Sequence, residues 1–173
     1  MTADKLDKLN QYDVWDSGRV RRWHTHPHIT PQNVADHSWG VVAILYLICA
    51  HPSRVLIKAA VFHDIAEIHT GDVPSVAKWT FSELKKVSDE CEKVVQDKFN
   101  LVPELEEDEM RLLKWADLME LALYCHHESM LGNTFARQTA EYVIVNILTK
   151  TVPNFMAKDL LDHHFEGVYY GER

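Results

Sequence analysis

Hydrophobic residues recur at helical spacing along almost the whole chain, whereas strand-like alternation is scarce. Proline and glycine interrupt this pattern at intervals and divide the chain into segments of helical length. The expected helices span residues 3–15, 34–50, 53 to 64–67, 82–99, 106–130, 134–150 and 154–165. Residues 16–32 and the stretch around Gly71 and Pro74 are expected to be irregular. The pattern predicts an all-α fold, and because no repeat or linker divides residues 1–173, we expect a single compact helical bundle.

Composition narrows the classes of protein that fit this pattern. The length of 173 residues and the hydrophobic fraction of 46% suit one globular domain with a substantial core. A net charge of −8 argues against a non-specific binder of nucleic-acid polymers. The longest apolar run, Val41 to Ala50, is too short to span a bilayer, and residues 1–8 lack the apolar core of a signal peptide. The three cysteines form no C-x-x-C pair, so we expect reduced thiols, a cytoplasmic location and no membrane partner.

The adjacent pair His63-Asp64 is the strongest chemical signal in the chain. It ends an apolar helical run, and Glu67 and Asp72 follow at offsets that keep them nearby. Imidazole and carboxylate together suit a divalent transition metal, and eleven histidines are many for this length. On spacing alone the alternative is equally good: His63 is a core imidazole and Asp64 a surface acid at a helix end.

His37 and Asp117 are polar residues inside strongly apolar helical stretches. A buried polar group without a partner is costly, so each side chain needs one. His37 could be a satisfied core residue, and Asp117 could form a buried salt bridge with Lys114 or Arg137. Taken singly, each position favours that structural interpretation over metal binding.

The segment Arg19-Val-Arg-Arg-Trp-His24 places guanidinium groups beside an indole. Arginine side chains suit phosphate oxygens, and tryptophan can stack on a base. The alternative is a solvated basic turn with Trp23 anchored in the core. Lys78 could be a second phosphate contact or a surface residue.

Taken together, these residues resemble the HD-domain phosphohydrolases. The order His37, His63-Asp64 and Asp117 matches the H, HD and D metal-binding pattern of that superfamily. The longer segments Arg22-Trp23, Asn33-Val-Ala-Asp-His-Ser38 and Phe62-His-Asp-Ile-Ala-Glu-Ile-His-Thr-Gly-Asp-Val-Pro-Ser75 resemble the bacterial 5′-deoxynucleotidases and their short bacteriophage relatives. The resemblance covers about residues 4 to 150, and it implies that residues 1–173 form one HD phosphohydrolase domain.

The resemblance also implies roles for individual residues. One divalent transition metal (zinc, cobalt or manganese) would be bound by His37, His63, Asp64 and Asp117. The attacking water and its protons would be handled by Glu67 and Asp72, and phosphate would be held by Arg22 and Lys78, with Trp23 against the sugar or base.

Among the bacteriophage relatives, the short chain looks most similar to the dATP triphosphohydrolases. The positions that grip the purine in those enzymes correspond to Thr25 and Val76, and threonine departs from the apolar residue expected at the first of them. We therefore expect hydrolysis of dATP, or another purine deoxynucleoside triphosphate, to a deoxynucleoside and triphosphate. Arg19 and its neighbours would add cations near the phosphates, where a second divalent ion can also bind.

Two other functions fit the same residues. One is a 5′-deoxynucleotidase that acts on deoxynucleoside monophosphates, and the other is a non-catalytic nucleotide-binding module with a structural metal. Because relatives of this branch are dimers or larger rings, the resemblance also implies a homo-oligomer, either a dimer or a hexameric ring.

Overall fold

The computed structural model describes residues 10–165, apart from the side chains at positions 75, 76 and 79, and the regular elements of that range are all helical. They are α2 (Gln11–Ser17), α3 (Val34–Ile48), α4 (Arg54–Phe62), α5 (Glu67–Thr70), α6 (Ser75–Thr80), α7 (Ser82–Phe99), α8 (Glu107–Met130), α9 (Thr134–Asn146), the 3₁₀ helix η1 (Leu148–Lys150) and α10 (Phe155–Phe165). The predicted all-α fold is confirmed. No helix within the described part of the chain combines the length and the apolar composition needed to cross a membrane.

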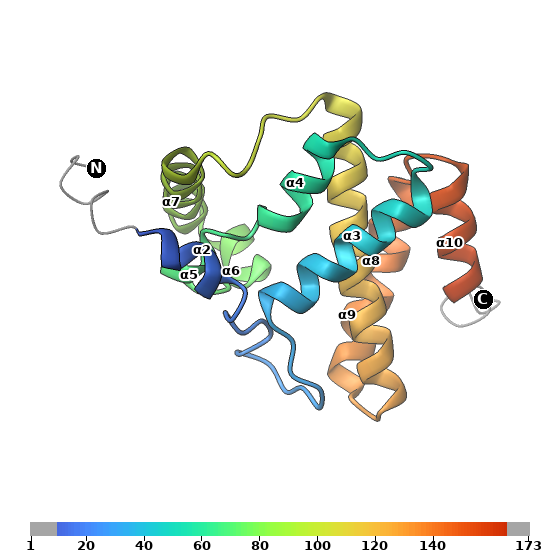
Figure 1. Ribbon diagram of the computed structural model, residues 1–173. Helices are drawn as coiled ribbons and strands as arrows, with labels where there is room; N and C mark the ends of the chain where they lie inside the picture. The colour runs from blue at the N-terminus through green and yellow to red at the C-terminus, as the bar shows by residue number, and fades with distance from the viewer. Residues whose placement is uncertain (1–9, 166–173) are drawn as a thin grey trace.

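The long helix α8 forms the centre of the molecule. It packs against α9, α3 and α4, while α10 packs on α3 (Figure 1). Figure 1 shows α2, α5, α6 and α7 gathered on one side of this centre and α10 on the other. The main core joins α3, α8, α9 and α10 through fully buried side chains such as Leu45, Trp115, Met119, Ile144 and Phe165. A smaller core around Ile65, Ala66 and Val95 holds the α5 region against α7.

Local capping explains where α3 and α4 begin. The Asn33 side chain accepts a hydrogen bond from the Asp36 backbone and the Asp36 side chain accepts one from the Asn33 backbone, which forms a capping box at the start of α3. Ser53 caps α4 through the backbone N–H of Leu56. The capping box at α3 fixes the first turn of that helix, which carries His37.

The helix boundaries agree with the sequence pattern where the pattern is long. Helix α7 spans the predicted residues 82–99, and α8 begins one residue after the predicted 106. The predicted helix 134–150 instead ends at Asn146 and continues as η1, and residues 3–9 of the predicted first helix lie outside the described residues. The stretch around Gly71 and Pro74 is only partly irregular because two short helices, α5 and α6, flank it.

The buried carboxylate of Glu128 fastens residues 27–30 to the end of α8. Its oxygens accept hydrogen bonds from the backbone N–H groups of Ile29 and Thr30, both at 2.7 Å, and from the Thr30 hydroxyl. Asn133 donates to the same carboxylate at 3.0 Å and to the carbonyl oxygen of Pro27 at 2.8 Å. Burial alone would raise the pKa of Glu128, but the hydrogen bonds from Thr30, Asn133 and the backbone outweigh it and lower the pKa to about 2.

Replacing Glu128 by glutamine should therefore destabilise the protein at neutral pH and remove part of its acid sensitivity. A pKa that falls from 4.5 to about 2 on folding contributes about 3 kcal/mol above pH 5, and this stability is lost as the pH falls through the folded value. Urea unfolding of both proteins between pH 7 and pH 3 measures the difference, which should shrink as the pH falls. The exposed Glu141, paired with Arg137, provides a matched control whose glutamine variant should show no such trend. A pH-independent difference for Glu128→Gln would contradict this role.

Candidate metal centre and adjoining cavity

Three helices bring together the four side chains of the H, HD and D pattern. His37 lies in the first turn of α3, His63 caps the end of α4 and Asp64 follows it, while Asp117 lies in the middle of α8. The His37 Nε2 atom lies 3.2 Å from His63 Nε2, 3.0 Å from an Asp117 oxygen and 3.7 Å from an Asp64 oxygen. Residues that are 80 positions apart in the chain thus converge on one point.

Each histidine uses its Nδ1 atom in a hydrogen bond directed away from this point. His63 Nδ1 lies 2.8 Å from the carbonyl oxygen of Ala60, which can only accept, so this nitrogen carries the hydrogen and Nε2 is left with a lone pair. His37 Nδ1 lies 2.5 Å from a carboxylate oxygen of Glu120. Both Nε2 atoms therefore face the centre, in the arrangement common for metal-binding histidines.

The donor set fits a divalent transition metal. One ligand atom from each of His37, His63 and Asp117 lies within 4.8 Å of the others. Asp64 adds a carboxylate oxygen 3.4 Å from His63 Nε2, although the same oxygen also lies 2.5 Å from the guanidinium of Arg22. Two imidazole nitrogens with carboxylate oxygens are the ligands that zinc, cobalt and manganese share.

Strong electrostatic coupling marks the cluster. Burial alone would lower the pKa of His37, but hydrogen bonds to Asp117 and Glu120 raise it to about 9. Burial would raise the pKa of Asp117, yet the His37 hydrogen bond and the neighbouring positive charges lower it to about 2. The pKa of Asp64 is lowered in the same way, because His63 and Arg22 outweigh its burial. These carboxylates therefore carry their negative charge at neutral pH, as metal ligands must.

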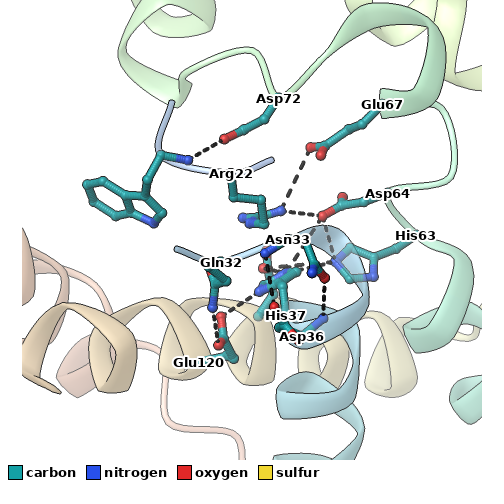
Figure 2. Close-up of polar contacts among 12 residues, drawn as sticks. Arg22, Gln32, Asn33, Asp36, His37, His63, Asp64, Glu67, Asp72 and Glu120 are labelled. Atoms are coloured by element: carbon teal, nitrogen blue, oxygen red, sulfur yellow. Dashed lines mark hydrogen bonds and ion pairs between the residues drawn. The ribbon is translucent and has the colours of Figure 1, made fainter. Parts of the chain in front are cut away.

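Arg22 and Glu67 extend the cluster on the side of Asp64 (Figure 2). An Arg22 Nη1 atom lies 3.8 Å from a Glu67 oxygen, and both side chains are 14% exposed. Burial and the negative charge of Asp64 raise the pKa of Glu67 to about 8. Within residues 10–165, Arg22 Nε and Glu67 Oε2 are buried without a hydrogen-bond partner. A donor and an acceptor left open beside a cluster of metal-ligating groups indicate that the site receives a further polar group.

A cavity of about 460 Å³ adjoins Arg22. Trp23, Thr25 and Asp72 line it together with Phe135 and Tyr142 of α9. Trp23 has a left-handed backbone conformation with φ at 59°, and its N–H donates to Asp72 at 3.1 Å. This bond ties the segment after Arg22 to the loop that follows α5. The cavity therefore combines aromatic walls with polar groups, among them Arg22 of the cluster.

Two predicted substrate contacts pair with other residues, and the structure does not describe the side chain of a third. Lys78 of α6 pairs with Glu92 of α7 at 3.2 Å. Arg19 is a surface residue that pairs with Asp16 at 3.5 Å. The side chain of Val76 lies outside the described residues. The expected basic cluster around the phosphates is thus represented at the site by Arg22.

Several side chains around the site were missed by sequence reasoning. Glu120 contacts His37 from behind and accepts a hydrogen bond from Gln32, while Gln138 and Thr139 of α9 line the cavity. Glu120 follows Asp117 by three positions, so both lie on one face of α8, and a second acid inside that apolar helix was an available signal. The α9 residues carry no recognisable motif. The alternative for Asp117 was a salt bridge with Lys114 or Arg137. Among the described contacts, Arg137 pairs instead with Glu141.

Comparison with known proteins gives this geometry its context. The family model of YfbR-like 5′-deoxynucleotidases matches residues 16–163. The chain belongs to this family. It is 27% identical over 138 residues to the 5′-deoxynucleotidase YfbR of Escherichia coli O127:H6, an alignment that covers 66% of this chain and 69% of the relative. It is 24% identical over 165 residues to a 5′-deoxynucleotidase of Citrobacter koseri, with 80% and 83% of the two chains covered.

Solved structures share the fold of this YfbR-like protein. The HD phosphohydrolase DatZ of cyanophage S-2L, bound to dA and one catalytic Zn²⁺ ion, superposes with a TM-score of 0.70 and 24% identity over 91% of this chain and 95% of its own. The protein PH0347 of Pyrococcus horikoshii gives a TM-score of 0.61 with 22% identity over 88% and 94% of the two chains. The chain is therefore an HD-domain phosphohydrolase, and the predicted superfamily and enzyme class are confirmed.

Proposed function

We propose that this enzyme hydrolyses the phosphate ester of a 2′-deoxynucleoside 5′-monophosphate and releases the deoxynucleoside and inorganic phosphate. The observation that carries the proposal is the convergence of His37, His63, Asp64 and Asp117 beside the unpartnered polar atoms of Arg22 and Glu67. The names of the YfbR relatives as 5′-deoxynucleotidases support the substrate class.

In the proposed site, His37, His63, Asp64 and Asp117 hold one divalent metal, which we take to be zinc, cobalt or manganese. Such an ion supplies Lewis acidity toward a phosphoryl oxygen and makes water a better nucleophile at neutral pH. Each histidine engages its Nδ1 atom in a hydrogen bond, which orients the ring so that Nε2 would face the ion.

Arg22 binds the phosphate in this proposal. The guanidinium of Arg22 is mostly buried, and its Nε–H has no hydrogen-bond acceptor. An anionic phosphate oxygen can accept this hydrogen bond next to Asp64 and Glu67. Negative charge that develops on the phosphoryl oxygens is stabilised most strongly where water is excluded. Arg22 thus both orients the substrate and stabilises the transition state.

Glu67 handles protons in this proposal. Because burial and Asp64 raise the pKa of Glu67 to about 8, its carboxyl group exchanges a proton close to neutral pH. It can take a proton from the attacking water and return one to the leaving 5′-oxygen of the nucleoside. Asp72 shares this task in the proposal. It has a second role, because its Oδ2 atom accepts a hydrogen bond from the Trp23 N–H and so orients Trp23.

The cavity receives the nucleoside in this proposal. Trp23, Phe135 and Tyr142 line the cavity, and Tyr124 outside it packs against Trp23 with ring centroids 5.7 Å apart. Aromatic walls of this kind suit a planar base. Thr25 lines the same cavity, which supports a substrate contact for this residue.

A second candidate is the dATP triphosphohydrolase reaction that the sequence suggested. The exposed Arg19 and Arg21 lie on the same segment as Arg22 and could approach a longer phosphate chain, with a second divalent ion on the phosphates. The pairing of Lys78 with Glu92 takes away one of the cations on which that expectation depended. We therefore rank the monophosphate first.

The test is to incubate the purified protein with dAMP or dATP and each of Zn²⁺, Co²⁺ and Mn²⁺, and to separate the products. Deoxyadenosine and inorganic phosphate from dAMP are the expected products. Deoxyadenosine and triphosphate from dATP, without turnover of dAMP, would favour the second candidate. The reaction should stop when the metal is removed with a chelator and resume when it is restored; no turnover of either nucleotide with any metal would contradict both.

We propose one HD domain over residues 1–173, a homo-oligomer that is either a dimer or a hexameric ring, and a cytoplasmic location. Deoxynucleotides, rather than nucleic-acid polymers, are the proposed partners, in keeping with the net charge of −8. Size-exclusion chromatography with light scattering would measure the assembly state.

A further inference from the structure

Glu120 lies behind the cluster, one turn along α8 from Asp117, and uses both of its carboxylate oxygens. Oε2 lies 2.5 Å from Nδ1 of His37, and Oε1 accepts a hydrogen bond from Nε2 of Gln32 at 2.8 Å. Figure 2 shows Glu120 reaching Gln32 and His37 from α8. The Glu120 side chain is 11% exposed, so these contacts are shielded from water. One buried carboxylate therefore touches a proposed metal ligand and a second segment of the chain at once.

Gln32 is also hydrogen-bonded to the backbone of Arg22. The backbone N–H of Arg22 donates to the carbonyl oxygen of Gln32 at 3.0 Å, and a β-bridge joins the neighbouring Arg21 and Asn33. Gln32 is itself only 7% exposed. A continuous path of hydrogen bonds therefore runs from His37 through Glu120 and Gln32 to Arg22.

The chemistry of this path requires a carboxylate at its centre. The amide nitrogen of Gln32 is a donor, and the His37 Nδ1 atom must carry a hydrogen if its Nε2 lone pair is to bind a metal. Two donors directed at one side chain need two acceptor oxygens. An amide at position 120 would offer only one, and its NH₂ group would face a second donor.

Gly40 of α3 makes room for this carboxylate. A Cβ atom at position 40 would lie 2.6 Å from Cγ and 3.2 Å from Oε1 of Glu120. Helices α3 and α8 therefore approach so closely that the Glu120 side chain lies against bare backbone. Any larger residue at position 40 would push Glu120 away from its two partners.

We propose that Glu120 is a positioning residue that couples the metal ligand His37 to the phosphate-binding Arg22, and that Gly40 allows it to do so. The inference rests on the proposed function, since it takes the cluster to hold a metal and Arg22 to bind phosphate. Glu120 acts through its neighbours, because its two oxygens are engaged by His37 and Gln32. It orients the His37 imidazole, increases its basicity as a ligand and fixes the segment that carries Arg22.

The test measures metal affinity directly, so that it does not depend on turnover. The full-length apoprotein and its Glu120→Gln variant are titrated with Co²⁺ in competition with a chromophoric chelator, and the visible spectrum of bound Co²⁺ is recorded. We expect Glu120→Gln to bind Co²⁺ roughly 10- to 100-fold more weakly, with an altered spectrum. Gly40→Ala should weaken binding in the same direction, and it keeps the test valid if Glu120→Gln does not fold.

Two matched variants separate positioning from general support of the loop. Tyr124→Phe removes the hydrogen bond from the same face of α8 to the Thr30 carbonyl, and it should leave Co²⁺ affinity unchanged because His37 is untouched. Gln32→Met breaks the path on the side of Arg22 alone. It should preserve Co²⁺ affinity and raise the KM for dAMP, whereas Glu120→Gln should change both.

The outcomes distinguish this inference from the proposed function. A folded Glu120→Gln variant that binds Co²⁺ as tightly as the wild type overturns the positioning role, and so does an equal loss in Tyr124→Phe. If the wild type binds Co²⁺ and Glu120→Gln weakens binding, but neither dAMP nor dATP is hydrolysed, the positioning of His37 stands and the proposed reaction is wrong. A wild-type protein that binds no Co²⁺ overturns both.

Discussion

Replacing Asp117 by alanine should abolish metal binding and, with it, hydrolysis. The side chain supplies a carboxylate oxygen 3.0 Å from His37 Nε2, and it contributes the third member of the group whose ligand atoms lie within 4.8 Å of one another. Without Asp117, one carboxylate and two neutral imidazoles remain, and that carboxylate, Asp64, is also paired with Arg22. The loss of metal affinity should exceed the roughly 10- to 100-fold cost that is typical of outer-shell substitutions.

Metal content after purification and turnover of dAMP measure this effect. We also expect lower stability, because the hydrogen bond that the fully buried His37 donates to Asp117 helps to hold the imidazole in its charged form when no metal is bound. Asp108, an exposed acid on the same helix that pairs with Arg111, provides the control, and its alanine variant should keep both metal and rate. Full metal content in Asp117→Ala would remove this residue from the ligand set.

Replacing Arg22 by methionine should lower kcat/KM for dAMP by about 100-fold while metal content is preserved. The estimate follows from a loss of about 3 kcal/mol when one well-placed donor to a developing charge is removed. Methionine keeps much of the buried apolar stem, so packing beside Trp23 is largely retained. Lysine should not restore the rate, because a single ammonium group cannot reproduce the fork of a guanidinium group.

Arg19→Met is the matched control for this experiment, since Arg19 lies on the same segment but is exposed and paired with Asp16. It should leave the rate with dAMP nearly unchanged. A marked loss with dATP alone would indicate that the outer arginines bind a longer phosphate chain and would favour the triphosphate reaction. An Arg22→Met enzyme with normal kcat/KM would show that phosphate binds elsewhere.

Long periodic segments made most of the fold predictable from the sequence. Helix α7 presents eighteen residues of regular pattern and was placed to the residue, whereas α5 and α6 have four and six residues, too few to show helical periodicity. The hydrogen bonds of α5 are also mixed, because Glu67 and His69 donate to carbonyl groups three residues earlier. A single turn stabilised by tertiary contacts leaves almost no mark on the sequence.

The candidate site was predictable where the order of its residues matches a family pattern. The H, HD and D order led us to expect a common site for His37, His63, Asp64 and Asp117, and the structure brings these side chains together. Tertiary contacts were harder to predict. The position of Lys78 after the His63-Asp64 motif could not reveal that Glu92 of α7 pairs with it. Glu120 is a second example, since its partners His37 and Gln32 are more than 80 positions away along the chain.

The turn after Phe62 cannot accept an inserted residue without moving Asp64, so labels must be inserted elsewhere in this enzyme. Adjacent residues of a continuing helix point about 100° apart and could not both face one point. His63 and Asp64 do so because the regular helix α4 ends at Phe62. From Phe62 to Glu67 the hydrogen bonds tighten to a three-residue spacing, and one added residue there would turn Asp64 away. The surface connection between Ile48 and Ser53 carries no such constraint. A spectroscopic probe or an immobilisation handle should therefore be inserted next to the exposed Ala50 and His51.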